Sequence, residues 1–110
     1  MWTDRAEIIS NFNEAISYIE FQNCFHDYRL GNIQIFDSKI IIMIEEDLKK
    51  KAHIWDFSFI KTSELKMEMD CVMPAYITEI EINDHFVTIS LDNGYISFNA
   101  EELLLGIPKF

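Results

Sequence analysis

Cysteine, proline and glycine are all scarce in this sequence of 110 residues, which contains two, two and three of them, respectively. The two cysteines, Cys24 and Cys71, are too few for the disulfide framework of a small secreted protein. With so little glycine and proline, the chain is neither collagen-like nor a linker, and it has no glycine-rich phosphate loop. We expect both thiols to be reduced and buried.

Long apolar runs are also missing. The longest, Ile40 to Ile44, has five residues, whereas a membrane-spanning helix needs ~18. The N-terminus lacks a basic region followed by an apolar stretch, so no secretory signal is predicted. We therefore expect a cytoplasmic protein that does not enter a membrane.

Basic residues are few. Nine Lys and Arg face nineteen Asp and Glu, so the net charge is −10. Between Met67 and Pro108 there is no Lys or Arg, but there are eight carboxylates. The negative potential of these carboxylates repels phosphate backbones, which argues against direct nucleic-acid binding and favours a cationic partner. Acidity also serves solubility alone, and that alternative stays open.

The apolar content is ample by contrast. Hydrophobic residues make up 49% of the chain, including nine Phe, four Tyr and two Trp. This is enough for one buried core and excludes a disordered acidic tail. At this length, residues 1–110 are expected to form a single domain.

The N-terminal pattern predicts an amphipathic helix from Asp4 to about Phe21, capped by Thr3. Its apolar stripe has three- and four-residue spacing and comprises Ile8, Ile9, Phe12, Ala15, Ile16 and Ile19.

After this helix the period changes to two, which predicts strands. The expected strands cover residues 24–30, 33–35, 40–44, 55–59, 65–73, 78–82, 87–91 and 96–98. Turns or loops are expected at Gly31-Asn32, Asp37-Ser38, Glu45 to Lys51, Lys61 to Glu64 and Asn93-Gly94, with a bulge or bend at Pro74. Trp55, Phe57 and Phe59 should be buried against the helix stripe, and the opposite strand face, with Ile54 and Ile60, should be partly wet.

The C-terminal pattern predicts a short helix. Asn99 and Glu102 form a box-like cap before Leu103 to Leu105, and Gly106 and Pro108 follow. The predicted fold is therefore an α+β domain. It has an N-terminal amphipathic helix packed on an antiparallel β-meander of about six to eight strands, and a short C-terminal helix.

No complete catalytic motif is present, and no Gly-x-Ser-x-Gly elbow occurs. His26 and Asp27 would point to opposite faces of an expected strand, which argues against a dyad. Zinc could use Cys24 and His26 with His53, His85 or Cys71, but no spacing fixes a first pair of ligands. We predict no enzyme activity, no metal and no cofactor.

Glu79 and Glu81 would share one face of a strand at a spacing of ~6.6 Å, a distance that would also suit a glycosidase pair. Exposed alternating carboxylates are far commoner. Asp84 and Asp92 lie in the turns that bound the next strand, and none of the four has a Lys or Arg nearby in the sequence. We predict that Glu79, Glu81, Asp84 and Asp92 form a face that binds a basic protein.

One stretch resembles a known pattern. Asn23-Cys24-Phe25-His26-Asp27-Tyr28-Arg29-Leu30, followed by Ile33-Gln34-Ile35 and Ile40 to Ile44, is similar to small bacterial proteins in which a Phe-His-Asp triplet follows a first helix and opens a β-meander. The run from Ile80 to Ala100 is similar as well. Several such families are immunity proteins of polymorphic toxin systems. The resemblance implies a small single domain and toxin neutralisation, and it identifies no contact residue.

The expected function is therefore that of a non-enzymatic acidic binding module, an immunity-like protein that neutralises a basic bacterial toxin such as a nuclease. The alternatives are a housekeeping structural or interaction protein with incidental acidity and, less favoured, a small ligand-binding protein or enzyme. A deep apolar pocket that holds His26 or His53 beside a carboxylate would favour the last of these.

Overall fold

The structure of the chain, a computed structural model, describes residues 5–46, 53–69 and 75–108. Its elements in chain order are β1 (Arg5–Ile9), α1 (Phe12–Phe21), η1 (Asn23–Phe25), β2 (Arg29–Phe36), β3 (Lys39–Glu45), β4 (Ile54–Met69), β5 (Ala75–Asn83), β6 (Phe86–Leu91) and β7 (Gly94–Pro108). The predicted α+β class, with an N-terminal helix and an antiparallel sheet, is confirmed. The seven strands fall within the expected six to eight.

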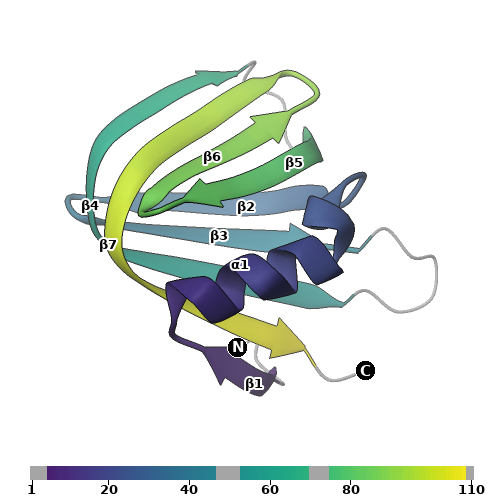
Figure 1. The fold of residues 1–110 in the computed structure, drawn as a ribbon. Helices are drawn as coiled ribbons and strands as arrows, with labels where there is room; N and C mark the ends of the chain where they lie inside the picture. Colours follow the sequence, from purple (N-terminus) through teal and green to yellow (C-terminus); the bar gives the residue numbers. More distant parts are fainter. Residues whose placement is uncertain (1–4, 47–52, 70–74, 109–110) are drawn as a thin grey trace.

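The sheet closes into a barrel. The strand order is β1-β7-β4-β3-β2-β5-β6, and β6 also pairs with β7 (Figure 1). Six antiparallel strands thus form the closed barrel, and β1 adds to the free part of β7. β4 and β7 have 16 and 15 residues and are long enough to curve around the barrel. β7 pairs with β4 along most of its length, with β6 near its start and with β1 near its end.

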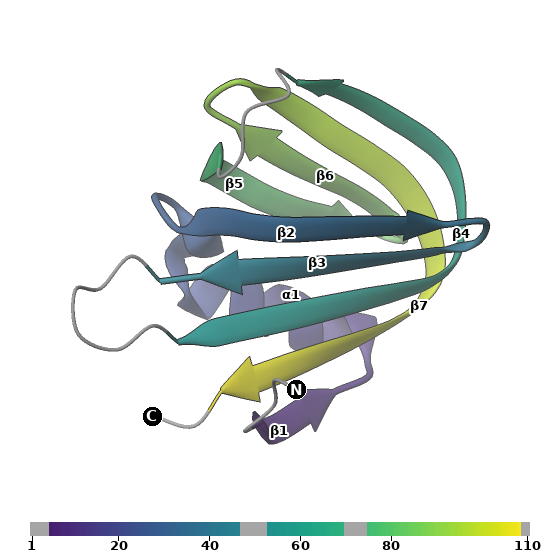
Figure 2. The ribbon, with the colours of Figure 1, turned by 180° about the vertical axis from the view of Figure 1, so that it is seen from behind.

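The helix covers the inner side of the barrel. In Figure 1, α1 lies in front of β3, β4 and β7, and Figure 2 shows the opposite side of these strands with α1 behind them. Ala15 and Ile19 of α1 are buried, and Phe12 and Ile16 pack against the core. The buried Trp55 indole N–H donates a hydrogen bond of 2.8 Å to the Tyr18 hydroxyl, which ties the helix to β4.

Period-two alternation sets the core. The inward-facing, buried side chains of the strands include Ile40, Ile42, Ile44, Trp55, Phe57, Phe59, Val87, Ile89, Leu91, Ile96, Phe98, Leu103, Leu105 and Ile107. The predicted burial of Trp55, Phe57 and Phe59 is confirmed, and Ile54 and Ile60 on the other face are partly exposed, as expected. Ile8 is 53% exposed and lies outside the predicted helix contact.

The N-terminal boundary of the helix was predicted wrongly. Arg5–Ile9 is a strand that pairs with Leu105 to Pro108, and the helix begins at Phe12. Asn11 caps it by accepting a hydrogen bond from the Glu14 backbone N–H. Ile8 and Ile9 continue the helical spacing by chance, while pairing with β7 satisfies their backbone groups. Thr3 lies outside the described residues.

The predicted C-terminal helix is also wrong, because β7 runs without a break to Pro108. Leu103, Leu105 and Ile107 point inward in alternation. This segment pairs with β4 on one side and β1 on the other. Two ladders of backbone hydrogen bonds outweigh a box-like cap at Asn99.

Three predictions for residues 23–64 are also wrong. Residues 23–25 form η1 and not a strand, and Gly31-Asn32 lies inside β2 at a register shift. A Cβ at Gly31 would meet the Glu45 carboxylate, so that flexible side chain would have to shift. The predicted turn from Lys61 to Glu64 is instead an irregular part of β4, where the register shifts and the long strand bends.

Two predicted turns are confirmed. Asp37 and Ser38 connect β2 to β3, and the β6–β7 hairpin turns just before Gly94. The bend at Pro74, the residue Cys71 and most of the charged loop, residues 47–51, lie outside the described residues. Over the described ranges, no helix combines the length and apolar character needed to cross a bilayer.

Candidate functional site

The connection between α1 and β2 has an unusual backbone. Asn23, Cys24, Phe25 and Asp27 all have positive φ, at 55°, 56°, 57° and 71°. A residue with a Cβ loses about 1–2 kcal/mol in this left-handed region, and none of these four is a glycine. Three such residues in a row make η1 a left-handed turn. A turn of this kind persists only where the surroundings hold it.

The burial of Phe25 is the main contact that holds this turn. Its side chain is fully buried, with its ring edge-on to Tyr28, Trp55 and Phe57 at centroid distances of 5.4, 5.5 and 6.1 Å. Such aromatic pairs add about 0.5–1.5 kcal/mol each beyond the burial of their area. The left-handed turn therefore anchors itself in the barrel core through one side chain.

Backbone hydrogen bonds then fix the turn to β5. The Asp27 N–H donates to the Ile77 carbonyl at 2.8 Å, and the Ile77 N–H donates to the Tyr28 carbonyl at 2.7 Å. Within the turn, the His26 N–H donates to the Asn23 carbonyl at 3.0 Å. The side chains that the turn exposes are consequently held on a rigid base.

His26 and Asp27 come together on this turn. The His26 Nδ1–H donates to the Thr78 carbonyl at 2.9 Å, which directs Nε2 outward. Nε2 lies 3.5 Å from the Asp27 carboxylate, and the two side chains are 52% and 84% exposed. The expectation that they point apart assumed a strand at this position, and the left-handed backbone removes that premise. A contact so exposed contributes little to stability.

Carboxylates gather around the neighbouring Cys24. Burial raises the pKa of the Cys24 thiol, and the negative charges of Glu79, Glu20 and Glu81 raise it further. The end of α1 and the middle of β5 thus bring their acids to one place. The high pKa keeps the thiol protonated, which makes Cys24 a poor nucleophile.

The four sequence-predicted binding residues do not all meet. Glu79 and Glu81 are exposed on the same side of β5. Asp84 and Asp92 occupy turns at opposite ends of β6. Asp92 also exchanges hydrogen bonds with the Tyr76 backbone: its carboxylate accepts from the N–H at 3.2 Å, and its own N–H donates to the carbonyl at 3.0 Å. Asp92 therefore lies beside the start of β5, whereas Asp84 follows its far end.

We define the acidic corner as the exposed side chains Glu20, Asp27, Glu79 and Glu81 around the left-handed turn. Sequence reasoning did not assign Glu20 and Asp27 to the binding face. The only signal in the sequence was the Phe-His-Asp triplet itself, because the meeting of α1 with β5 is a tertiary contact. The first cation after the turn, Arg29, pairs with Glu45 at 2.7 Å.

The three histidines lie in different surroundings. His26 is bound to Thr78, His53 contacts Glu46 at 2.6 Å through Nδ1, and His85 stacks on Phe12 at a centroid distance of 4.4 Å. In the portion of the chain that is described, no three His, Cys, Asp or Glu side chains form a group that could hold a metal. Cys71, which the zinc hypothesis included, lies outside that portion.

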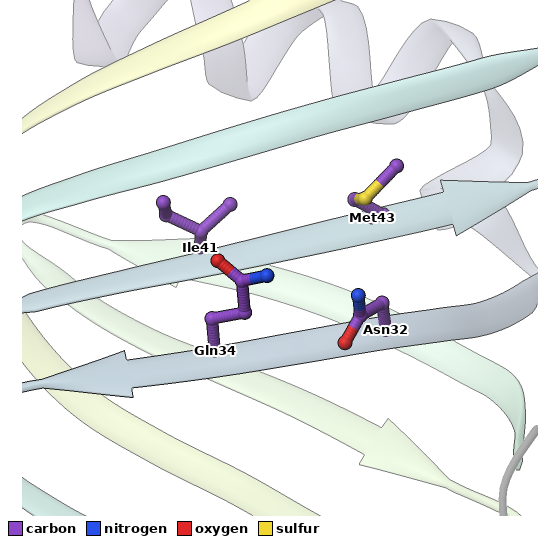
Figure 3. Close-up of a pocket in the computed structure, with 4 residues that line it drawn as sticks. All are labelled: Asn32, Gln34, Ile41 and Met43. Atoms are coloured by element: carbon purple, nitrogen blue, oxygen red, sulfur yellow. The ribbon is translucent and has the colours of Figure 1, made fainter. Parts of the chain in front are cut away.

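A hollow of about 100 Å³ lies on the outer side of β2 and β3. Figure 3 shows its lining residues Asn32, Gln34, Ile41 and Met43. None of them is a histidine or a carboxylate, so this hollow does not have the features that would favour an enzyme or carrier.

No family model, curated protein or solved structure matches this chain.

Proposed function

We propose that this protein is a non-enzymatic, cytoplasmic binding module that neutralises a basic bacterial toxin domain. The acidic corner would be its main contact surface, together with the adjacent Asp92 and, at the far end of β5, Asp84. The observation that carries this proposal is that backbone hydrogen bonds fix the left-handed turn, with its exposed Asp27, to β5, from which the exposed Glu79 and Glu81 project.

Like charges placed close together on a sheet repel and reduce stability. A surface shaped by solubility alone intersperses the two signs. Keeping several carboxylates beside a strained, well-anchored turn is better explained by a cationic partner. Because the backbone of the turn is already fixed, binding does not have to order it, which favours affinity.

A toxin that cleaves nucleic acid fits this chemistry, since its cleft must be cationic to bind phosphates. An acidic corner seated in such a cleft would block the substrate and would associate rapidly at low ionic strength. The resemblance of the Phe-His-Asp region to immunity-type proteins supports the same function. A nucleic-acid partner would be repelled by this surface.

The test begins with affinity capture from the native cell at low and then at high salt. We expect a basic toxin domain that is retained at low salt and inhibited by one equivalent of the protein. Capture of a partner without inhibition would instead favour a housekeeping interaction.

Binding kinetics then test the surface. The double variant Glu79→Lys/Glu81→Lys should slow association with the captured toxin by about tenfold or more at low salt and should flatten its salt dependence. The double variant Asp37→Lys/Glu101→Lys is the matched control, because it changes the net charge equally at two exposed sites outside the acidic corner. Equal association rates for the two variants would refute the acidic corner as the contact.

A further inference from the structure

The outer side of the sheet formed by β2, β3, β4 and β7 has no other described element packed on it. Figure 2 views this side directly, with α1 behind the strands. The strand registers place Gln34, Ile41, Ser58 and Leu104 in one row across the four strands. Asn32 and Met43 belong to the adjacent row. We call these six side chains the neutral face.

The neutral face differs from the rest of this acidic chain. Its six residues are apolar or carry an amide or a hydroxyl, and none is charged. Leu104 is 41% exposed, and Asn32 and Gln34 are exposed as well. Asp56, the one acid in the adjacent row, is buried and already has an interaction partner.

At both ends of this face the described charges are nearly balanced in sign, and the exposed Lys39 lies in the same row as Glu102. Arg29 contacts Glu45 at 2.7 Å at one end. At the other end, Lys61 contacts Glu102 at 3.5 Å. As far as the described residues go, the face and its borders are therefore close to neutral, although the chain as a whole has a net charge of −10.

We propose that the neutral face binds a second copy of this chain in a two-fold symmetric dimer. Symmetry of this kind brings each surface against itself, so the surface must be self-complementary. Amides and hydroxyls both donate and accept hydrogen bonds, and they can pair with their own kind. A cationic partner would gain nothing from a neutral face, whereas two strongly acidic chains can approach each other only where their charge is absent or balanced.

The size of the face sets the strength of the contact. Four strands at a spacing of ~4.8 Å, over about seven residues of ~3.4 Å each, cover roughly 450 Å² per copy, with the neutral face at the centre of this area. The total of about 900 Å² is that of a weak, transient interface. The dimer is therefore reversible and depends on concentration. It leaves α1 and the left-handed turn free, so each dimer presents two acidic corners.

Sedimentation velocity of the full chain tests this proposal at concentrations of ~1–500 μM and ionic strengths of ~20 and ~300 mM. We expect a species of 13.0 kDa that converts to one of twice that mass as concentration rises. Salt should strengthen the dimer, because it screens the repulsion between two chains of charge −10. Salt should weaken toxin binding, so the dimer and the toxin complex respond to ionic strength in opposite directions. A monomer at every concentration, or a dimer that salt dissociates, would overturn the proposal.

A pair of isosteric variants locates the interface. Gln34→Glu places a carboxylate from each copy inside the proposed interface and should raise the dissociation constant of the dimer by about tenfold or more. Asn83→Asp adds the same charge at an exposed strand residue outside the neutral face and should change it by less than about twofold. Equal effects of the two variants would refute the neutral face as the interface. Toxin binding by the Gln34→Glu variant should match that of the parent chain, which separates this result from the proposed function.

Discussion

Asp27 offers a direct test of the left-handed turn. Its φ is 71° and its side chain is 84% exposed, so a substitution there removes almost no packing. The variants Asp27→Ala and Asp27→Gly both delete the same carboxylate and the same contact with His26. A difference in stability between them therefore reports the backbone alone.

The expected magnitude follows from two opposing effects. A residue with a Cβ loses about 1–2 kcal/mol in the left-handed region, and glycine does not. Glycine loses about 0.5–1 kcal/mol more backbone entropy than alanine on folding. Asp27→Gly should therefore unfold with a free energy ~0.5–1 kcal/mol higher than that of Asp27→Ala. The alanine variant should also be less stable than the parent chain, because aspartate tolerates this region better.

Urea unfolding followed by circular dichroism gives both free energies by linear extrapolation. The control is the same pair of substitutions at Glu79, an exposed strand residue without a positive φ. There the order should reverse, with Glu79→Gly less stable than Glu79→Ala, because only the entropy of glycine remains. If glycine were the less stable variant at both positions, the backbone at Asp27 would not be left-handed and the argument for a strained turn would fail.

Two further predictions concern the core and its pH dependence. Phe57→Ala should lower the free energy of unfolding by ~3–5 kcal/mol. Phe57 is buried, and its ring centroid lies 5.4 Å from that of Phe59 and 6.1 Å from that of Phe25. A loss below about 1 kcal/mol in urea unfolding would contradict this packing. Burial raises the pKa of Cys24, Tyr18 and Tyr28 above their ordinary values of 9.0 and 10.0. The folded chain thus keeps protons that the unfolded chain releases, so this stabilisation is complete below about pH 9 and is lost as the pH rises toward 11 and beyond. Thermal unfolding between about pH 8 and 11 measures it, and a flat profile would contradict the burial of these groups.

The acidic corner was only half visible in the sequence. Glu79 and Glu81 were expected on one side of a strand, and both are exposed there, because side-chain alternation is a local property of an extended backbone. Glu20 lies 59 residues before Glu79 in the chain. Its proximity to the β5 carboxylates depends on how α1 packs against the barrel, which no local pattern encodes.

The left-handed turn was not visible at all. Residues 23–27 contain no glycine to mark a positive φ, and the period of two that we read across residues 24–30 favours a strand. The burial of Phe25 among three aromatic rings and the hydrogen bonds to Ile77 decide the backbone instead. The juxtaposition of His26 with Asp27 follows from that decision.

The sequence by itself determined the strands whose faces differ in polarity and the turns between them. Trp55, Phe57 and Phe59 point into the core as expected, and so do Val87, Ile89 and Leu91. These predictions held because both the period of two and the chemistry of a tight turn act over a few neighbouring residues.

Only the tertiary structure decided the two ends of the chain and the closure of the barrel. The local patterns of residues 5–9 and 103–105 favour helices, yet residues 5–9 pair as β1 with residues 105–108 of β7. Each segment provides the backbone partners that the other needs, and they are about a hundred residues apart in the sequence. Closure of the barrel through β6 and β7 and through β2 and β5 depends on pairing at long range in the same way. Local propensity is worth only a few tenths of a kcal/mol per residue, so a complete ladder of hydrogen bonds over a buried face overrides it.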